Sequence, residues 1–179
     1  VHNIIIAEED SKAHIITSCV QHSNVPQAAH LGISEIYVKK GALLNFTMIH
    51  QWGENTFVRP RSATQIDDNA TFISNYVCMR PVRDTQMYPA AYCNGENSRV
   101  IFNSIVYGHK NSLLDLGSKA VLTGKGSKAE MVSRAITRDG SKMIIRGLID
   151  GDNSDCKGHL ECQGLIFDDI SFMQSIPEL

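Results

Sequence analysis

Apolar and polar residues alternate along much of this chain in short runs, and turn residues separate one run from the next. The run at 142–149 shows the pattern clearly, because its even and odd positions would face opposite ways in an extended segment. One face carries Met143, Ile145, Gly147 and Ile149, and the other carries Lys142, Ile144, Arg146 and Leu148. Ile144 and Leu148 make the second face partly apolar, which is typical of strands that are covered on both sides.

Runs of this kind predict a series of short strands. The strands are expected at 3–8, 13–20, 34–39, 42–49, 56–59, 71–78, 99–106, 119–123, 129–136, 142–149 and 159–167. No segment of 12 or more residues shows the 3.6-residue period of a helix, and the best candidate, 127–137, lacks an apolar stripe. We therefore expect an all-β protein with little or no helix.

A short motif recurs along the chain, in which a turn residue and a small residue precede a cation or alanine and then an apolar run. Copies begin at Asp10, Gly117, Gly126 and Gly140, and looser copies begin at Gly41, Asn69 and Asn97. Short strands without helices allow a sandwich, a barrel or a β-helix. The repeated motif favours a stacked β-helix that forms one domain over residues 1–179, although the copies are irregularly spaced, at intervals of 9 to 31 residues.

Composition and charge narrow the picture further. Ile and Val together number 30 against 11 Leu, and β-branched side chains fit a pleated surface better than a helix. The net charge of −2 gives no basic field, so neither nucleic acid nor a membrane surface is expected as a partner. The odd count of five cysteines without a Cys-x-x-Cys pair predicts a reducing, cytoplasmic location rather than a disulfide framework.

The densest group of candidate metal ligands contains Cys156, His159, Glu161 and Cys162. In a regular strand His159 and Glu161 would point to one side and Cys162 to the other. These three side chains could then meet one ion only through a bulge or with ligands from a second chain. The alternative is a packed Cys162 beside a solvated pair of His159 and Glu161.

Two thiols and one aromatic pair stand at the ends of predicted strands. Cys19 and Cys78 each close an apolar run, where a thiol is more accessible than in mid-strand, although packing is the simpler interpretation of Cys78. His50 precedes the single tryptophan, Trp52, just before a turn.

Two cations follow in the next predicted strand. Arg59 and Arg61 form either an anion site or a solvated edge, and Pro60 between them belongs on an edge or in a bend, because it lacks a donor. Sequence motifs of P-loop, dinucleotide-binding, zinc-protease and serine-hydrolase enzymes are absent, so an enzyme with its own nucleotide chemistry is disfavoured.

A series of longer stretches points to a family. They are 3–11, Thr47 to Trp52, Thr71 to Cys78, 87–89, 94–98, 127–136, 145–148, 158–166 and 176–179. Taken in order, they resemble the SufB/SufD family of iron–sulfur cluster assembly proteins, in particular the short SufB-like proteins of archaea and anaerobic bacteria. The resemblance implies a right-handed parallel β-helix and a scaffold role without turnover chemistry of its own.

The resemblance also implies partners and a cargo. Members of this family form a homodimer or a SufB/SufD-type heterodimer through the β-helix and associate with the SufC ATPase. Sulfur arrives as persulfide from a cysteine-derived sulfur donor protein, and a transient iron–sulfur cluster is built at the dimer interface. The isolated chain need not retain that cluster.

Residues of this chain match the positions that carry sulfur in the family. Cys19, after Ala7-Glu-Glu-Asp-Ser, matches a family cysteine that follows a similar stretch. The segment His50-Gln51-Trp52 matches a family Gln-Asn-Trp segment that is implicated in sulfur passage, with Trp52 kept and His50 in place of Gln. A basic residue after that segment corresponds to Arg59 or Arg61. The implied set for sulfur acceptance and transfer is Cys19, His50, Trp52 and Arg59.

A second family cysteine matches Cys162 in the stretch Glu-Cys-Gln-Gly-Leu-Ile. The resemblance makes Cys162 the candidate ligand of an iron–sulfur cluster, with Glu161 and His159 as local candidates beside it. Relatives continue beyond the Pro-Glu-Leu at 177–179 with a segment that contains His and Glu, followed by a helical domain that docks the ATPase. We therefore expect this chain to be a β-helix core without that C-terminal domain.

Two other functions remain as alternatives. A β-helix enzyme that acts on polysaccharide would present paired carboxylates along one groove, whereas Asp68, Asp115 and Asp139 have no recurring strand position. A purely structural, SufD-like subunit would not need a cluster cysteine, and Cys162 argues modestly against it.

Overall fold

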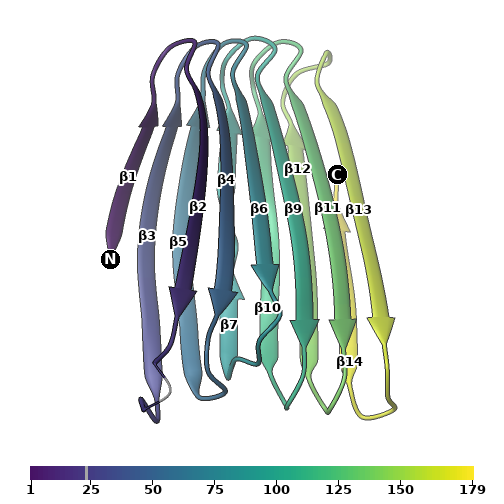
Figure 1. Ribbon diagram of the computed structural model, residues 1–179. Helices are drawn as coiled ribbons and strands as arrows, with labels where there is room; N and C mark the ends of the chain where they lie inside the picture. Colours follow the sequence, from purple (N-terminus) through teal and green to yellow (C-terminus); the bar gives the residue numbers. More distant parts are fainter. Residues whose placement is uncertain (23) are drawn as a thin grey trace.

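The computed structural model describes residues 1–22 and 24–179, and all their regular structure is β-strand. The strands form two sheets that face each other (Figure 1). Sheet A consists of β1 (His2–Ala7), β3 (Ala28–Val38), β5 (Thr56–Ile66), β7 (Asp84–Met87), β8 (Ala90–Cys93), β10 (Leu113–Leu122), β12 (Lys142–Gly151) and β14 (Phe172–Glu178). Sheet B consists of β2 (Lys12–Val20), β4 (Leu43–Gln51), β6 (Thr71–Cys78), β9 (Arg99–Gly108), β11 (Lys128–Thr137) and β13 (Lys157–Ile166).

The chain winds as a β-solenoid, which confirms the prediction of stacked parallel strands. It passes from one sheet to the other at each turn, so strands that pair within a sheet come from successive turns and run parallel. Strands β1 and β2 lie at one end of the stack, and β13 and β14 lie at the other (Figure 1). No helix among the described residues is long and apolar enough to cross a membrane.

The recurring sequence motif marks the turns of the solenoid. The turn residue adopts a positive φ between 54° and 72° at Asp10, Gly41, Asn69, Asn97, Asn111, Gly126, Asp139 and Gly140. Glycine, Asn and Asp tolerate this left-handed conformation better than other residues. The small residue that follows is packed inside, since Ala70, Ser98 and Ser127 are fully buried.

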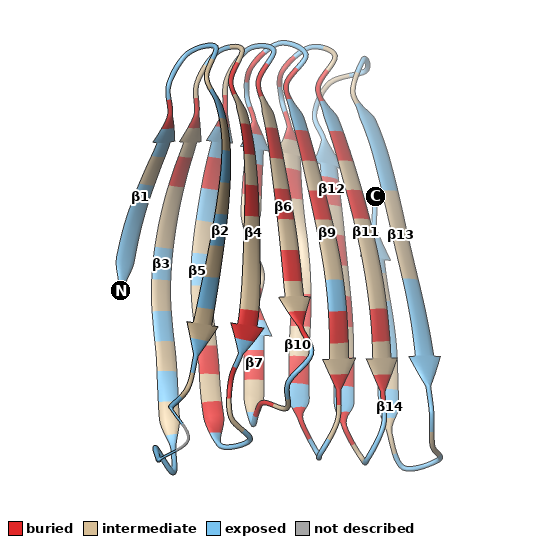
Figure 2. Cartoon of the chain, in the orientation of Figure 1, coloured by how far each residue is buried: buried red, intermediate tan, exposed pale blue. Residues whose placement is uncertain are grey.

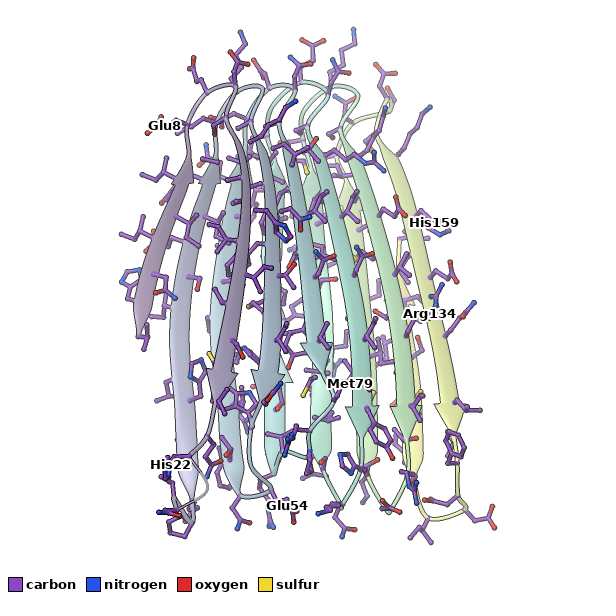
Figure 3. The ribbon with its side chains drawn as sticks, in the orientation of Figure 1. Glu8, His22, Glu54, Met79, Arg134 and His159 are labelled. Carbon is purple, nitrogen blue, oxygen red and sulfur yellow. The ribbon has the colours of Figure 1, made fainter. Side chains whose placement is uncertain are left out.

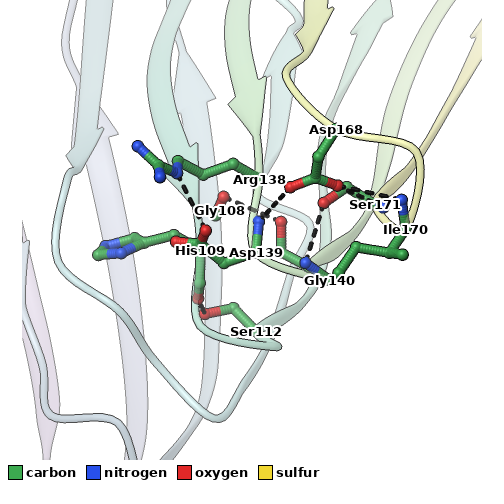
Figure 4. Close-up of polar contacts among 10 residues, drawn as sticks. Gly108, His109, Ser112, Arg138, Asp139, Gly140, Asp168, Ile170 and Ser171 are labelled. Atoms are coloured by element: carbon green, nitrogen blue, oxygen red, sulfur yellow. Dashed lines mark hydrogen bonds and ion pairs between the residues drawn. The ribbon is translucent and has the colours of Figure 1, made fainter.

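Hydroxyl groups at these buried positions hold the turns together. Ser98 donates to the carbonyl of Gly95 at 2.8 Å, and Ser141 donates to the carbonyl of Gly108 at 2.9 Å. At the last turn the carboxylate of Asp168 accepts backbone N–H groups from Asp139 and Ser171 (Figure 4). Hydrogen bonds therefore form both within a bend and to the bend stacked on it, whereas the buried hydroxyls of Ser11 and Ser127 have no partner among the described residues.

Several sequence predictions were wrong in detail. Gly117 lies in the middle of β10 and not in a turn. The bend that precedes β10 has its own copy of the motif, which starts at Asn111. Strands β7, β8 and β14 were not predicted. Pro60 lies inside β5 and not in an edge strand, but the break between β7 and β8 leaves it without a partner on that side, which suits a residue that lacks a donor.

The space between the sheets is filled by alternate residues of every strand. In β6 the inward side chains are Phe72, Ser74, Tyr76 and Cys78, and all four are buried. Burial is continuous in the middle of the stack and falls off at both ends, where β1, β2, β13 and β14 are mostly exposed (Figure 2). The interior is therefore closed along the solenoid and least covered at its two end turns.

Candidate functional site

Cys19, His50 and Cys78 lie side by side in three neighbouring strands. Cys19 of β2 is the register partner of His50 in β4, and His50 is the register partner of Cys78 in β6. All three point into the solenoid, because they share the strand parity of the buried residues. The packing interpretation of Cys78 is confirmed, since this residue is 1% exposed, whereas Cys19 in the edge strand is half-buried.

An aromatic cluster surrounds His50. Its ring centroid lies 5.1 Å from the rings of both Trp52 and Tyr76, and the ring of His30 from the opposite sheet lies 4.7 Å from Trp52. The hydroxyl of Tyr76 lies 3.3 Å from Nδ1 of His50. The indole N–H of Trp52 is buried and has no hydrogen-bond acceptor among residues 1–22 and 24–179. The cluster therefore contains an N–H donor without a partner among the described residues, and Cys19 packs against the same group of residues.

Burial controls protonation in this cluster. It lowers the pKa of His50 to about 4, with a smaller contribution from the neighbouring His30, because the imidazolium cation loses its water. Burial also raises the pKa of the Cys19 thiol. It raises the pKa of the Cys78 thiol as well, by more than the neighbouring Tyr76 lowers it. At neutral pH the cluster contains a neutral imidazole between two protonated thiols.

We expect the free energy of unfolding to rise with pH between about 4 and 6.5. In this window the unfolded chain binds a proton at His50 that the folded chain does not, so the slope is positive. One such group contributes up to about 1.4 kcal/mol per pH unit. The stability is fully present above 6.5 and is lost as the pH falls toward 4. Urea unfolding of the parent and of His50→Gln at several pH values measures this, and identical slopes in the two proteins would contradict it.

Arg59 does not join this cluster. Its side chain points away from the interior of sheet A, since its neighbour Val58 is the fully buried one. Its guanidinium forms an ion pair with Asp84 at 2.8 Å and donates to the Asp84 carbonyl. Arg61 also points outward and donates to Gln86. Of the residues predicted for sulfur transfer, the structure brings together Cys19, His50 and Trp52.

The second candidate group lies in β13 at the opposite end of the stack. The interior contains two clusters of buried apolar residues. Cys162 faces inward and packs against one of them, and Leu160, which faces the same way, packs against the other. His159 faces outward (Figure 3). Glu161 shares its strand parity, pairs with Arg134 at 2.8 Å and lies 3.7 Å from His159. This confirms the parity that the sequence predicted and separates the thiol from the other two side chains.

No three His, Cys, Asp or Glu side chains within the described parts of the chain lie close enough together to bind one metal ion. Cys162 is half-buried in an edge strand, so its thiol lies next to the uncovered end of the solenoid. A cluster bound there would therefore need ligands from outside these residues.

Cys19 and Cys162 are far apart within one chain. Five strand steps separate β2 from β13, which corresponds to about 24 Å at the usual spacing. An interior cavity of about 40 Å³, enough for a few water-sized molecules, lies between them. Its lining includes Tyr76, Ser104 and Ser133, which form one register row that ends at Cys162.

The sequence did not indicate that the first cluster contains His30, Tyr76 and Cys78. Strand parity was a usable signal for Tyr76 and Cys78, because both are inward positions of β6. His30 comes from the other sheet, and the strand predicted there at 34–39 left out the first part of β3, in which His30 lies.

Comparison with known proteins gives consistent matches over the whole chain. Residues 1–179 match the family model described as SUF system FeS cluster assembly, SufBD core domain. An iron–sulfur cluster assembly SufBD family protein of Methanothermobacter thermautotrophicus is 53% identical over 178 residues, covering 99% of this chain and 43% of that protein. A SufBD family protein of Archaeoglobus fulgidus is 48% identical over 179 residues, covering 100% and 48%.

A more distant relative is the iron–sulfur cluster assembly protein SufB of Bacillus subtilis. It is 28% identical over 178 residues, covering 97% of this chain and 38% of that protein. The chain thus spans less than half the length of these relatives.

Proposed function

This chain belongs to the SufBD family of iron–sulfur cluster assembly proteins, and we propose that it is the β-solenoid core of a scaffold subunit on which a cluster is built. The observation that carries this proposal is the placement of two inward-facing thiols, Cys19 and Cys162, at the two ends of one interior that contains a cavity. Thiolates suit both roles, because they accept sulfane sulfur and bind iron.

Cys19 is the proposed sulfur acceptor. It lies in an edge strand and is half-buried, so a persulfide donor can reach it more easily than the buried Cys78 or Cys93. His50 beside it provides a neutral imidazole. Trp52 provides an unpaired N–H group that could donate a hydrogen bond to an anionic sulfur. The interior cavity supports passage of sulfur from this end toward Cys162.

Cys162 is the proposed iron ligand. Its neighbours Glu161 and His159 face outward, so they act as ligands in this proposal only toward an ion that is shared with a second subunit. Within residues 1–22 and 24–179, β13 and β14 each pair with one strand, and in this proposal a homodimer or a SufB/SufD-type heterodimer forms along their other edges. In this arrangement the cluster is cargo that the subunits build and release.

The remaining parts of the proposal concern partners. A SufC-like ATPase hydrolyses ATP for the complex, this subunit performs no turnover chemistry, and the complex works in the cytoplasm. A family-level role in iron–sulfur cluster assembly supports these points.

Anaerobic reconstitution with ferrous iron and sulfide tests the scaffold role. We expect the full-length protein to bind iron and acid-labile sulfide and to show the visible absorbance of an iron–sulfur cluster. Uptake of iron and sulfide no greater than that of a β-solenoid protein without cysteines would contradict the proposal.

A further inference from the structure

The motif Arg59-Pro60-Arg61 has no part in the proposed function, yet it lies where sheet A is incomplete. Strand β5 pairs with β7 as far as Val58 and pairs with β8 from Ala63 onward. Residues 59–62 therefore have no ladder partner on that side within the described parts of the chain, although β5 pairs with β3 over its whole length. We call the unpaired stretch between residues 59–62 and 86–89 the seam.

Proline explains why the ladder stops at the seam. The carbonyl of Thr56 accepts the N–H of Arg83 at 3.1 Å. Further along, the carbonyl of Ile66 accepts the N–H of Asn94 at 3.2 Å. Even-numbered residues of β5 thus bond toward β7 and β8, and Pro60 is one of these positions without an N–H to donate. Backbone bonds therefore join the two segments before and after residue 60 but not at it.

Two arginines bridge the seam from the outer face. Nη1 of Arg59 donates to the Asp84 carbonyl at 3.3 Å, and its Nη2 pairs with the Asp84 carboxylate at 2.8 Å. Nη1 of Arg61 donates to the Gln86 carbonyl at 3.2 Å, and its Nη2 donates to Oε1 of the same residue at 3.2 Å. Arg61 is exposed and Arg59 is half-buried, so these bonds open more readily than a buried backbone ladder.

The interior cavity lies directly behind the seam. Met87 and Pro89, on the inner side of the break between β7 and β8, both line it. Ser62 and Pro89 face inward and are nevertheless partly exposed. Val58 and Thr64, on the same face of β5, are 0% and 3% exposed. The interior is therefore less well covered at the seam than on either side of it.

The other flank of the break is closed. Both β7 and β8 pair with β10. Between them, Lys119 donates its backbone N–H to the Pro89 carbonyl at 2.8 Å. The ring of Tyr88 lies against Gly117, where an added Cβ would come within 2.9 Å of it. An opening at the seam would therefore separate β5 from the break and leave the contacts with β10 in place.

We propose that the seam is a side entrance to the interior cavity, that Arg59 and Arg61 hold it closed, and that it admits a small neutral molecule of the class of hydrogen sulfide. The cavity of about 40 Å³ has room only for molecules not much larger than water. Among the described residues that line it none is charged, so an anion would lose its water without gaining a partner. The lining instead offers polarizable thioethers and hydroxyls, which come from Met48, Met87, Met143, Ser104 and Ser133.

This entrance gives Cys162 a supply of sulfide that does not pass Cys19. The register row of Ser104 and Ser133 leads from the cavity to Cys162. Entry makes and breaks no covalent bond, so it needs neither an oxidant nor a reductant. The entrance goes beyond the proposed function and does not require Cys19 to accept sulfur.

Oxidation of methionine by hydrogen peroxide tests the entrance, because the oxidant is small and neutral and Met143 lines the cavity although it is 0% exposed. The full-length protein is treated with peroxide, quenched after increasing times and digested for mass spectrometry. We expect sulfoxide first at Met79, which is 50% exposed, and more slowly at Met143. Peroxymonosulfate, a larger and charged oxidant, should oxidise Met79 and leave Met143 intact.

Two variants should change the rate at Met143 in opposite directions. The double variant Arg59→Leu/Arg61→Leu removes the bonds across the seam and should speed oxidation at least about tenfold, as loss of hydrogen bonds from charged donors predicts. Pro60→Ala restores the missing N–H and should slow oxidation severalfold. Arg99→Leu is the matched control, because it removes an ion pair with Glu130 on sheet B and should leave the rate unchanged.

Cys93 reports global unfolding in the same samples, because it is 0% exposed and does not line the cavity. Its oxidation should stay at the parent level in every variant. Equal rates at Met143 in the parent, the double variant and Pro60→Ala overturn the entrance, as does a Met143 that is never oxidised. A rise at Cys93 that matches the rise at Met143 overturns it too, and oxidation of Met143 by peroxymonosulfate overturns its selectivity. None of these results touches Cys19 or Cys162, which reconstitution tests separately.

Discussion

The variant Cys162→Ser is expected to lose most of its capacity to take up iron and sulfide in anaerobic reconstitution. A serine hydroxyl replaces the thiolate that iron–sulfur clusters require, and no other thiol lies in β13 or β14 to substitute for it. Loss of a direct ligand should reduce bound iron at least about tenfold, since weaker changes around metal sites already cost that much. Bound iron and acid-labile sulfide per chain are the measured quantities.

Cys156→Ser is the matched control for this variant. Cys156 is also half-buried and lies near the same end of the chain, in the turn before β13, but it packs against the other interior cluster. We expect it to take up iron and sulfide like the parent. Equal uptake by the parent and Cys162→Ser would remove Cys162 from the proposed site.

The variant Gly124→Ala is expected to lower the free energy of unfolding by about 3 kcal/mol, the upper end for overpacking. A Cβ at Gly124 would lie 1.9 Å from the carbonyl oxygen of Gly95 in the bend of the preceding turn. Real Cβ atoms do not approach backbone so closely, so the two turns would have to separate. Chemical denaturation monitored by circular dichroism measures the loss.

Gly164→Ala distinguishes this backbone clash from the general effect of losing a glycine. The nearest atom to an added Cβ there is the thioether sulfur of Met173, the far end of a flexible side chain in β14. We expect a change below about 1 kcal/mol, because Met173 can adjust. A loss at Gly164 as large as that at Gly124 would argue against close stacking of the bends as the cause.

Local chemistry explains which parts of the fold were predictable. Alternation marked β6 and β12 correctly, because a strand with one face in the core must alternate whatever its partners are. Asn97 and Gly126 marked their turns, since few residues tolerate a positive φ. Gly117 carried the same local signal but lies in β10, where the carbonyl of Arg146 leaves no room for a Cβ. Glycine at this position allows a close contact between two turns, which the sequence alone does not reveal.

The features of the candidate site also differ in whether the sequence could predict them. Counting residues along one strand is enough to predict that Cys162 faces away from His159 and Glu161, because strand parity does not depend on the partners of the strand. The folded arrangement, in contrast, places Cys19, His50 and Cys78 in one row, since register between strands 28 to 31 residues apart depends on the length of every intervening turn. It also decided that Arg59 lies outside and His30 inside, because those positions depend on how the two sheets face each other.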